Sequence, residues 1–290
     1  MRYYLDTTTL FIQGAFRAAS TGSDGGILRV STLMNHTVQK DVSGIEPVKE
    51  LERVAAGAGI SRDFFGVLTA VPITSLCVLQ YDFITVFVTA GTETVPDTGM
   101  VNIIVCSSEG MADSTLLEMI MVATEAKTRA LLASGYDIPG PSTNAIITAC
   151  EGEARHPSSK RITAMRERVY TAVLKGFPEA LRRSKNPQGV TRPRFFIFSR
   201  FNGEHWVEWT PENCPYYPCH FAGQRCDFCY CPFYPCGNES LGDWTTSSNH
   251  GQIWNCARCT LIHEPKVANY LKNYPDASLE ELMHLKEKNT

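Results

Sequence analysis

The sequence predicts an α/β fold, with a mixed sheet, helices and some α+β character, followed by a small metal-stabilised domain rich in cysteine. Three observations carry this prediction. Apolar runs alternate with helical patterns up to about residue 185, a turn-forming stretch follows at 184–193, and eight of the eleven cysteines then lie between Cys214 and Cys259. Of the 290 residues, 43% are hydrophobic and 20% charged, as in ordinary globular proteins.

The first part of the chain reads as strands and helices in alternation. Runs rich in Val, Ile and Phe predict buried strands at 81–91, 100–108 and 144–152. The run 71–80 ends just before the first of these, which predicts a hairpin and therefore a mixed sheet. Helical periodicity predicts helices at 46–59, 112–135 and 159–184. The second helix has Asp113 or Ser114 as its expected N-cap and Gly135 as its terminator.

Three segments are expected. They are a large domain at 1–185, a linker with an aromatic hairpin at 186–210, and a cysteine-rich zinc-binding domain with a C-terminal helix at 211–290. Asn-Pro, Gly and Pro within 184–193 mark the boundary, and Asn202-Gly203 between two aromatic runs predicts the hairpin. The sequence leaves open which domain the hairpin joins.

Charge and hydropathy exclude several kinds of partner. Residues 211–290 hold six Lys and Arg against nine Asp and Glu, and the remainder balances at 21 against 21. Neither part has the basic face that nucleic-acid binding requires. No run approaches the roughly 18 apolar residues of a membrane span, and the N-terminus lacks the pattern of a signal peptide. We therefore expect a cytoplasmic protein without nucleic-acid or membrane partners, while a homo-oligomer stays open.

The cysteine cluster repeats one hexapeptide, CPYYPC at 214–219 and CPFYPC at 231–236. Two Cys-x-x-Cys pairs accompany it, with the spacing that lets both thiolates reach one tetrahedral ion. In a cytosolic chain such a cluster indicates metal binding rather than disulfides. We predict two structural zinc ions with ligands drawn from Cys214, Cys219, His220, Cys226, Cys229, Cys231, Cys236, Cys256, Cys259 and His263.

Two alternatives to structural zinc stay open. An iron–sulfur cluster is one, because the Cys-Pro at 231–232 follows a dense group of cysteines. A catalytic metal with an open coordination position is the other. Few aliphatic residues lie between 211 and 260, so metal is expected to supply much of the folding free energy of this segment.

The helix at 112–135 carries a lysine in an unusual place. At about 100° per residue, one expected face collects Leu116, Leu117, Ile120, Thr124, Lys127 and Leu131, and another collects Glu118, Glu125 and Arg129. A lysine inside an apolar stripe either extends to the helix edge or is held there for function. Glu125 precedes Arg129 by four residues, which is also the spacing of a surface ion pair.

Polar residues also gather where the expected strands begin and end, and they could converge at one edge of the sheet, where ligands commonly bind. They are Gly25, Gly26, Asn35, His36, Thr89, Gly91, Asn102, Thr143 and Asn144. Simpler explanations stay open for two of these features. The Gly25-Gly26 pair is also typical of a plain turn, and His36 of a satisfied core residue.

These phrases, in this order, resemble the adenosylcobinamide amidohydrolase family over about residues 5–183. The matching phrases are Gly-Gly at 25–26, Asn-His-x-Val at 35–38, Thr-Ala-Gly at 89–91, Asn-Ile-Ile at 102–104 and Thr-Glu-Ala-Lys-Thr at 124–128. The resemblance implies hydrolysis of the amide that joins aminopropanol to the corrin ring of adenosylcobinamide. The product is adenosylcobyric acid, in a corrinoid (cobalamin) salvage pathway typical of archaea, and a partner from that pathway stays open.

The resemblance and the needs of amide hydrolysis suggest roles for these residues. Glu125 is the expected base, Lys127 and Asn102 are electrostatic or hydrogen-bonding partners, and His36 is the proton donor. Substrate binding falls to Gly25, Gly26, Asn35, Thr89, Gly91, Thr143 and Asn144.

The chain departs from the family pattern at two places. Thr92-Glu93-Thr94 stands where an apolar residue, Ser and Asn are usual, and Thr143-Asn144 where Thr-Asp is common. Glu93 and Asn144 favour a rival hypothesis, a non-catalytic corrinoid-binding protein whose zinc module docks a partner. The Thr-Glu-Ala-Lys-Thr phrase favours the enzyme.

The C-terminal phrases CPYYPCH, RCDFCYCPFYPCG and NCARCTLIH resemble the cysteine-rich small domain family over about residues 195–270. That resemblance implies metal binding and no particular reaction.

Overall fold

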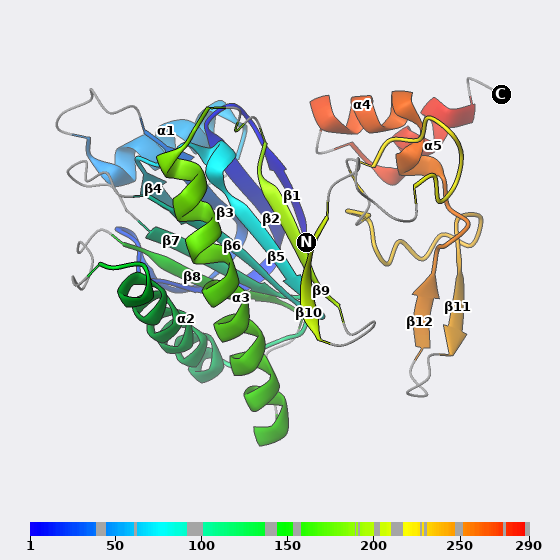
Figure 1. Cartoon of the computed structure of the whole chain (residues 1–290). Helices are drawn as coiled ribbons and strands as arrows, with labels where there is room; N and C mark the ends of the chain where they lie inside the picture. Colours follow the sequence, from blue (N-terminus) through cyan, green and yellow to red (C-terminus); the bar gives the residue numbers. More distant parts are fainter. Residues whose placement is uncertain are drawn as a thin grey trace. The chain divides into compact units, whose positions relative to one another are not determined.

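The computed structural model describes residues 1–38, 45–60, 63–91, 101–136, 144–152, 158–188, 190, 192–199, 204–209, 217–226, 228, 231–246, 252–274 and 277–287. The chain divides into two compact units, essentially Tyr3–Trp209 and Thr210–Thr290 (Figure 1). Among the described residues, no helix is both long enough and apolar enough to cross a membrane.

The larger unit is built on a ten-stranded mixed sheet of order β10-β9-β5-β6-β7-β8-β2-β3-β4, with β1 paired to β2. The strands are β1 (Arg2–Leu5), β2 (Thr9–Ser20), β3 (Gly26–Thr37), β4 (Phe64–Thr69), β5 (Cys77–Tyr81), β6 (Ile84–Ala90), β7 (Val101–Ser107), β8 (Ile146–Glu151), β9 (Arg194–Ser199) and β10 (His205–Trp209). Three neighbouring pairs are parallel, namely β3/β4, β7/β8 and β5/β9. The predicted mixed α/β fold is confirmed.

The predicted hairpins are both present. Strands β5 and β6 pair antiparallel around Asp82, whose φ of 52° is the left-handed conformation of a tight turn. Strand β5 begins only at Cys77, because Pro72 and the 3₁₀ turn Ile73–Ser75 occupy the first part of the expected strand. The aromatic hairpin forms β9 and β10 and extends the large sheet, where the Tyr81 and Phe198 rings stack 3.9 Å apart.

The sheet curls so strongly that its strands enclose part of the core. Strands β7, β8 and β2 lie between β6 and β3 in the sheet, yet Asn35 of β3 hydrogen-bonds Thr89 of β6. A register shift between Gln13 and Phe16 bends the long β2/β3 pair. Leu33, Phe87 and Ile104 belong to one buried cluster on the inner face of this curve.

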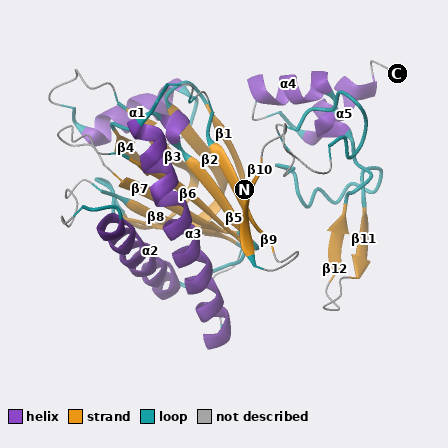
Figure 2. Ribbon diagram, viewed as in Figure 1, coloured by secondary structure: helices purple, strands orange, loops and turns teal. Residues whose placement is uncertain are grey.

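Helices cover the outer surface of the curled sheet (Figure 2). Helices α2 (Asp113–Ala133) and α3 (Ser159–Lys185) pack over the largest apolar cluster. Helix α1 (Pro47–Gly57) packs against β2 and β3 through Leu51, Phe11 and Met34. All residues of β6 and β7 are buried, as expected for strands covered on both faces.

Helix α2 differs from the predicted orientation in part. Lys127 is buried as expected, but Leu117 is 49% exposed and Thr124 is exposed, so these two positions were wrongly placed in the buried stripe. The N-cap is Ala112, because Asp113 instead forms a bidentate ion pair with Arg17 at 2.7 and 2.8 Å. The helix ends before Gly135, whose φ is +83°, as predicted.

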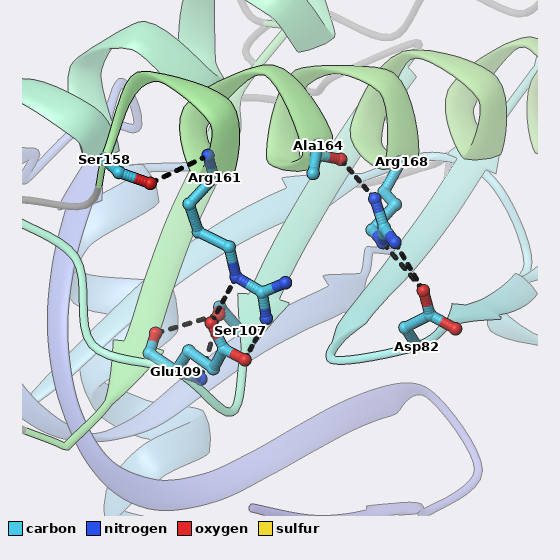
Figure 3. Close-up of polar contacts among 7 residues, drawn as sticks. All are labelled: Asp82, Ser107, Glu109, Ser158, Arg161, Ala164 and Arg168. Carbon is cyan, nitrogen blue, oxygen red and sulfur yellow. Dashed lines mark hydrogen bonds and ion pairs between the residues drawn. The ribbon is translucent and has the colours of Figure 1, made fainter. Parts of the chain in front are cut away.

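Helix α3 is fixed at its start by two arginines that point to different parts of the sheet (Figure 3). Arg161 forms a bidentate pair with Glu109 after β7, and Arg168 pairs with Asp82 at 2.5 Å. The Arg161 guanidinium also lies 3.8 Å from the ring centroid of Phe83. The β5/β6 turn and the polar segment after β7 therefore both hold α3.

The C-terminal unit has a small core. Strands β11 (Asp243–Thr246) and β12 (Gln252–Asn255) form a hairpin, followed by a 3₁₀ turn (Leu261–His263), α4 (Pro265–Asn273) and α5 (Leu279–Glu287). Its buried apolar cluster has six members, Leu261, Ile262, Val267, Leu271, Ala277 and Leu282. Helix α5 is the predicted C-terminal helix, whereas α4 was not foreseen.

Candidate functional site

The starts of the parallel strands β7 and β8 are tied together by two asparagines that act reciprocally. Asn144, just before β8, accepts a hydrogen bond from the backbone N–H of Val101 at 2.9 Å. Asn102, in β7, accepts one from the N–H of Ala145 at 3.2 Å. Each asparagine side chain thus accepts a hydrogen bond from a backbone N–H group at the start of the other strand, which fixes both strand starts.

A buried polar network continues from Asn102 across the curled sheet. The Nδ2 of Asn102 donates to the Leu68 carbonyl at 2.8 Å and to Asn35 Oδ1 at 3.3 Å, and Asn35 donates to Thr89 Oγ1 at 3.0 Å. These three side chains are at most 2% exposed. The structure therefore brings together Asn35, Thr89, Asn102 and Asn144, from strands distant in sequence.

The turn between β2 and β3 lies at the same edge. Thr21 exchanges hydrogen bonds with Ile146, its N–H reaching the Ile146 carbonyl and its Oγ1 accepting from the Ile146 N–H, both at 3.0 Å. A Cβ on Gly25 would lie 2.4 Å from the Ser20 carbonyl oxygen, and Gly26 has φ +133°, so both positions require glycine. Gly91 follows β6 at this edge, and Thr143 lies outside the described residues.

Lys127 lies level with this edge by the geometry of α2. The Leu116 carbonyl accepts a hydrogen bond from Thr148 in β8, and α2 runs antiparallel to that strand, with Met111 beside Cys150. The eleven residues from Leu116 to Lys127 rise about 16 Å, the length of about five strand residues. That places Lys127 level with the residues directly before β8.

The ammonium group of Lys127 belongs to a buried side chain. It is 7% exposed, and burial lowers its pKa from the ordinary value. Among the residues that the structure describes, none gives it a hydrogen bond or an ion pair. A buried cation without a counter-charge is costly, so its position favours a role in binding or chemistry over a role in stability.

Two of the expected catalytic side chains lie away from this edge. Glu125 is on the α3 side of α2, 55% exposed, with its carboxylate 3.9 Å from Arg166. His36 points to the α1 side of β3, where Nδ1 lies 2.8 Å from Thr9 Oγ1 and Nε2 lies 3.5 Å from Glu50. Burial lowers the pKa of His36, and Glu50 partly opposes this shift. Side chains alternate along a strand, so Asn35 and His36 face opposite ways.

The network should be costly to break. We expect Asn102→Leu to reduce the free energy of unfolding by about 2 kcal/mol or more, because it strands the Ala145 N–H and the Leu68 carbonyl. Urea denaturation measures the change. Asn186→Leu, the same replacement at the exposed end of α3, is the control and should stay within about 0.5 kcal/mol. Equal effects of the two changes would contradict a special role for Asn102.

In the C-terminal unit, four cysteines line one cavity together with His220 and His263. They are Cys231, Cys236, Cys256 and Cys259. Burial raises the pKa of the Cys231 thiol to about 12, and the three neighbouring thiols add to this shift. No disulfide joins any two of the described cysteines.

A buried glutamine that the sequence did not single out connects another pair of cysteines. Gln224 is 4% exposed, and its Nε2 lies 3.2 Å from the sulfurs of both Cys219 and Cys226. Its Oε1 accepts from the backbone N–H groups of His220 and Phe221. These bonds orient both thiols, the usual task of residues behind metal ligands.

The cysteine sulfurs are donors that suit a sulfur-preferring metal, but in this structure they do not converge on one metal position. Within the described part of the chain, no three His, Cys, Asp or Glu side chains form a ready metal-binding group. The predicted ligands Cys214 and Cys229 lie outside that part. Nδ1 of His263 is bonded to the Arg225 carbonyl at 2.8 Å, which leaves Nε2 as its free ring nitrogen.

Comparison with known proteins finds two families along the chain, one matching its first part and the other its second part. A family model described as adenosylcobinamide amidohydrolase matches residues 4–189, and one described as cysteine-rich small domain matches residues 205–286. An adenosylcobinamide amidohydrolase of Methanosarcina mazei is 34% identical over 195 residues, covering 62% of this chain and 98% of that protein.

Two further relatives match shorter stretches. An uncharacterized protein of Methanocaldococcus jannaschii is 45% identical over 56 residues, which are 19% of this chain and 47% of that protein. A probable cobalt-factor III C(17)-methyltransferase of Methanothermobacter thermautotrophicus is 48% identical over 62 residues, 21% of this chain and 17% of that protein. No solved structure gives a significant match.

The curled mixed sheet with its polar edge, followed by the cysteine-rich unit, defines a two-unit protein of the α/β class. The family match covers most of the larger unit and more than half of the chain. The chain belongs to the adenosylcobinamide amidohydrolase family, and the predicted fusion with a cysteine-rich small domain is confirmed.

Proposed function

We propose that this protein hydrolyses the amide between aminopropanol and the corrin ring of adenosylcobinamide, releasing adenosylcobyric acid for corrinoid salvage. The observation that carries the proposal is the 34% identity to the Methanosarcina mazei enzyme over 98% of that protein. The polar edge at the starts of β7 and β8 supports it, because the phrases that resemble the family meet there.

The placement of the side chains refines their proposed roles. Lys127 is the proposed electrostatic partner of the developing oxyanion, since it is buried without a counter-charge among the described residues. Asn35, Thr89 and Asn102 form hydrogen bonds with one another, so we assign them a positioning role. Gly25, Gly26, Gly91, Thr143 and Asn144 are kept as the proposed substrate-binding positions.

Glu125 and His36 have less support as base and proton donor. Glu125 approaches Arg166 on the outside of α2, and His36 is packed between Thr9 and Glu50. We propose that both stabilise the fold. Glu125→Gln with full activity would agree with this assignment.

The direct test is incubation of the purified protein with adenosylcobinamide, followed by chromatographic detection of adenosylcobyric acid and of free aminopropanol. Both products are expected in equal amounts. The rival hypothesis, a corrinoid-binding protein without catalysis, predicts a change in the corrinoid absorption spectrum on mixing and no release of aminopropanol. Absence of both product and binding would refute the proposal and its rival together.

For the C-terminal unit we propose two structural zinc ions. Support comes from its soft sulfur donors, the Gln224 bridge between two thiols and the small apolar core. The iron–sulfur alternative would give visible absorption and bound iron in the protein purified without oxygen. Cytoplasmic location, absence of nucleic-acid and membrane partners, and association with itself or a salvage partner stay predictions.

A further inference from the structure

The described cysteines of the C-terminal unit fall into two groups with different surroundings. Cys231, Cys236, Cys256 and Cys259 line one cavity. Cys219 and Cys226 are not among the residues that line it, and both instead approach the Nε2 of Gln224 at 3.2 Å. One amide nitrogen that reaches two sulfurs requires these two thiols to lie side by side.

Tight turns hold cysteines of the first group in place. The Cys231 carbonyl accepts from the Tyr234 N–H at 3.1 Å, and the Cys256 carbonyl accepts from the Cys259 N–H at 2.9 Å. A turn that closes within four residues puts the thiols of Cys256 and Cys259 on one side, as in a zinc knuckle. The second hexapeptide supplies the other two sulfurs, and β12 leads directly into Cys256.

Building on the metal binding proposed for this unit, we infer that Cys231, Cys236, Cys256 and Cys259 bind one divalent, sulfur-preferring ion such as zinc. Cys219 and Cys226 then belong to a different ion. Four thiols lose their protons to solvent as the ion binds, and four thiolates complete a tetrahedral shell. Closure of the sulfurs around the ion accompanies binding, because such units couple folding to metal uptake.

The two histidines beside the cavity are not ligands of this four-sulfur site. His220 and His263 line the same cavity, but their rings stack on each other with centroids 4.5 Å apart. His263 is further fixed through Nδ1 by the Arg225 carbonyl. A closed shell of four thiolates leaves no coordination position for either ring.

The inference is tested on the full wild-type chain, purified without oxygen and loaded with zinc. Chelator is added in steps, and exposed thiols are trapped with N-ethylmaleimide and located by peptide mapping. Labels on the four cysteines of the cavity should rise together with release of one ion, and labels on Cys219 and Cys226 with release of the other. Cys77, Cys106 and Cys150 are buried in the larger unit and should stay unlabelled throughout.

Matched double variants give a second, independent readout by elemental analysis. Cys236→Ser with Cys259→Ser should lose one of two ions, and Cys219→Ser with Cys226→Ser should lose the other. Adding His263→Ala to the second pair should leave its remaining ion bound. The mixed pair Cys219→Ser with Cys259→Ser should lose both ions.

Each outcome decides the question. Loss of only one ion by the mixed pair, or loss of the remaining ion on adding His263→Ala, overturns the assignment. If every double variant loses all metal, the wild-type labelling decides, and simultaneous labelling of Cys219 with the cavity cysteines overturns it. A wild-type chain that binds no metal refutes metal binding itself, whereas two ions with mixed labelling refute only this division of ligands.

Discussion

Replacing Lys127 by methionine is expected to lower the rate of adenosylcobinamide hydrolysis by about 100-fold or more, the usual cost of removing a preorganised oxyanion partner. The same change should make the fold more stable. Methionine is similar in length to lysine, and the substitution removes a buried cation that has no counter-charge among the described residues. Loss of activity with gain of stability separates a functional lysine from a structural one. Turnover assays and urea denaturation of the same preparations measure both effects.

The pH dependence of stability gives this prediction a second signature. Burial lowers the pKa of Lys127 below 10.5, so between the lowered value and 10.5 the unfolded chain binds more protons than the folded one. The free energy of unfolding should therefore rise with pH across that window in the wild type, and this contribution should vanish in Lys127→Met. Lys160→Met, on the exposed first turn of α3, is the control and should change neither slope nor activity. Normal turnover by Lys127→Met would remove Lys127 from the proposed site.

Chelation of the metal-loaded protein is expected to unfold the C-terminal unit and leave the larger unit folded. Among its described residues, the buried apolar cluster of the smaller unit has six members, so we expect its fold to depend on metal ligation more than on apolar burial. Hydrogen exchange followed by mass spectrometry should show α4 and α5 losing protection while β6 and β7 keep theirs. The larger unit serves as the internal control.

The response of activity to the chelator distinguishes the two roles of the metal. A structural metal predicts that hydrolysis continues after the C-terminal unit has lost its protection. Complete loss of hydrolysis with unchanged exchange in both units would instead indicate a catalytic metal. Retention of full protection after all metal has been removed would contradict metal-dependent folding.

The sequence predicted the elements whose residues share one environment. The buried runs of β6, β7 and most of β8, and the helices α1, α2 and α3, could be predicted because burial on every side, or on one helix face, leaves a plain pattern. The long strands β2 and β3 were not foreseen, since the register shift between Gln13 and Phe16 breaks their alternation. In α2, the step of about 100° per residue puts Leu117 at the edge of the expected face, whereas the helix buries Ala123, Ala126 and Ala130.

The candidate site was predictable to a similar extent. Convergence of Asn102, Asn144 and Thr89 followed from their places at strand ends, and the structure brings them together. The direction of His36 could not be deduced, because the face of a strand depends on register, and the curl of the sheet sets which face is inside. Gln224 could not be predicted, because nothing in a single sequence marks an amide nitrogen that contacts two cysteine sulfurs.

The reciprocal bonds of Asn102 and Asn144 have a consequence for how this chain can tolerate changes in its sequence. Each strand start is anchored by a side chain of its neighbour, so the register of β7 against β8 does not depend on the segments that lead into them. Insertions and deletions ahead of Val101 or Asn144 therefore leave the sheet aligned.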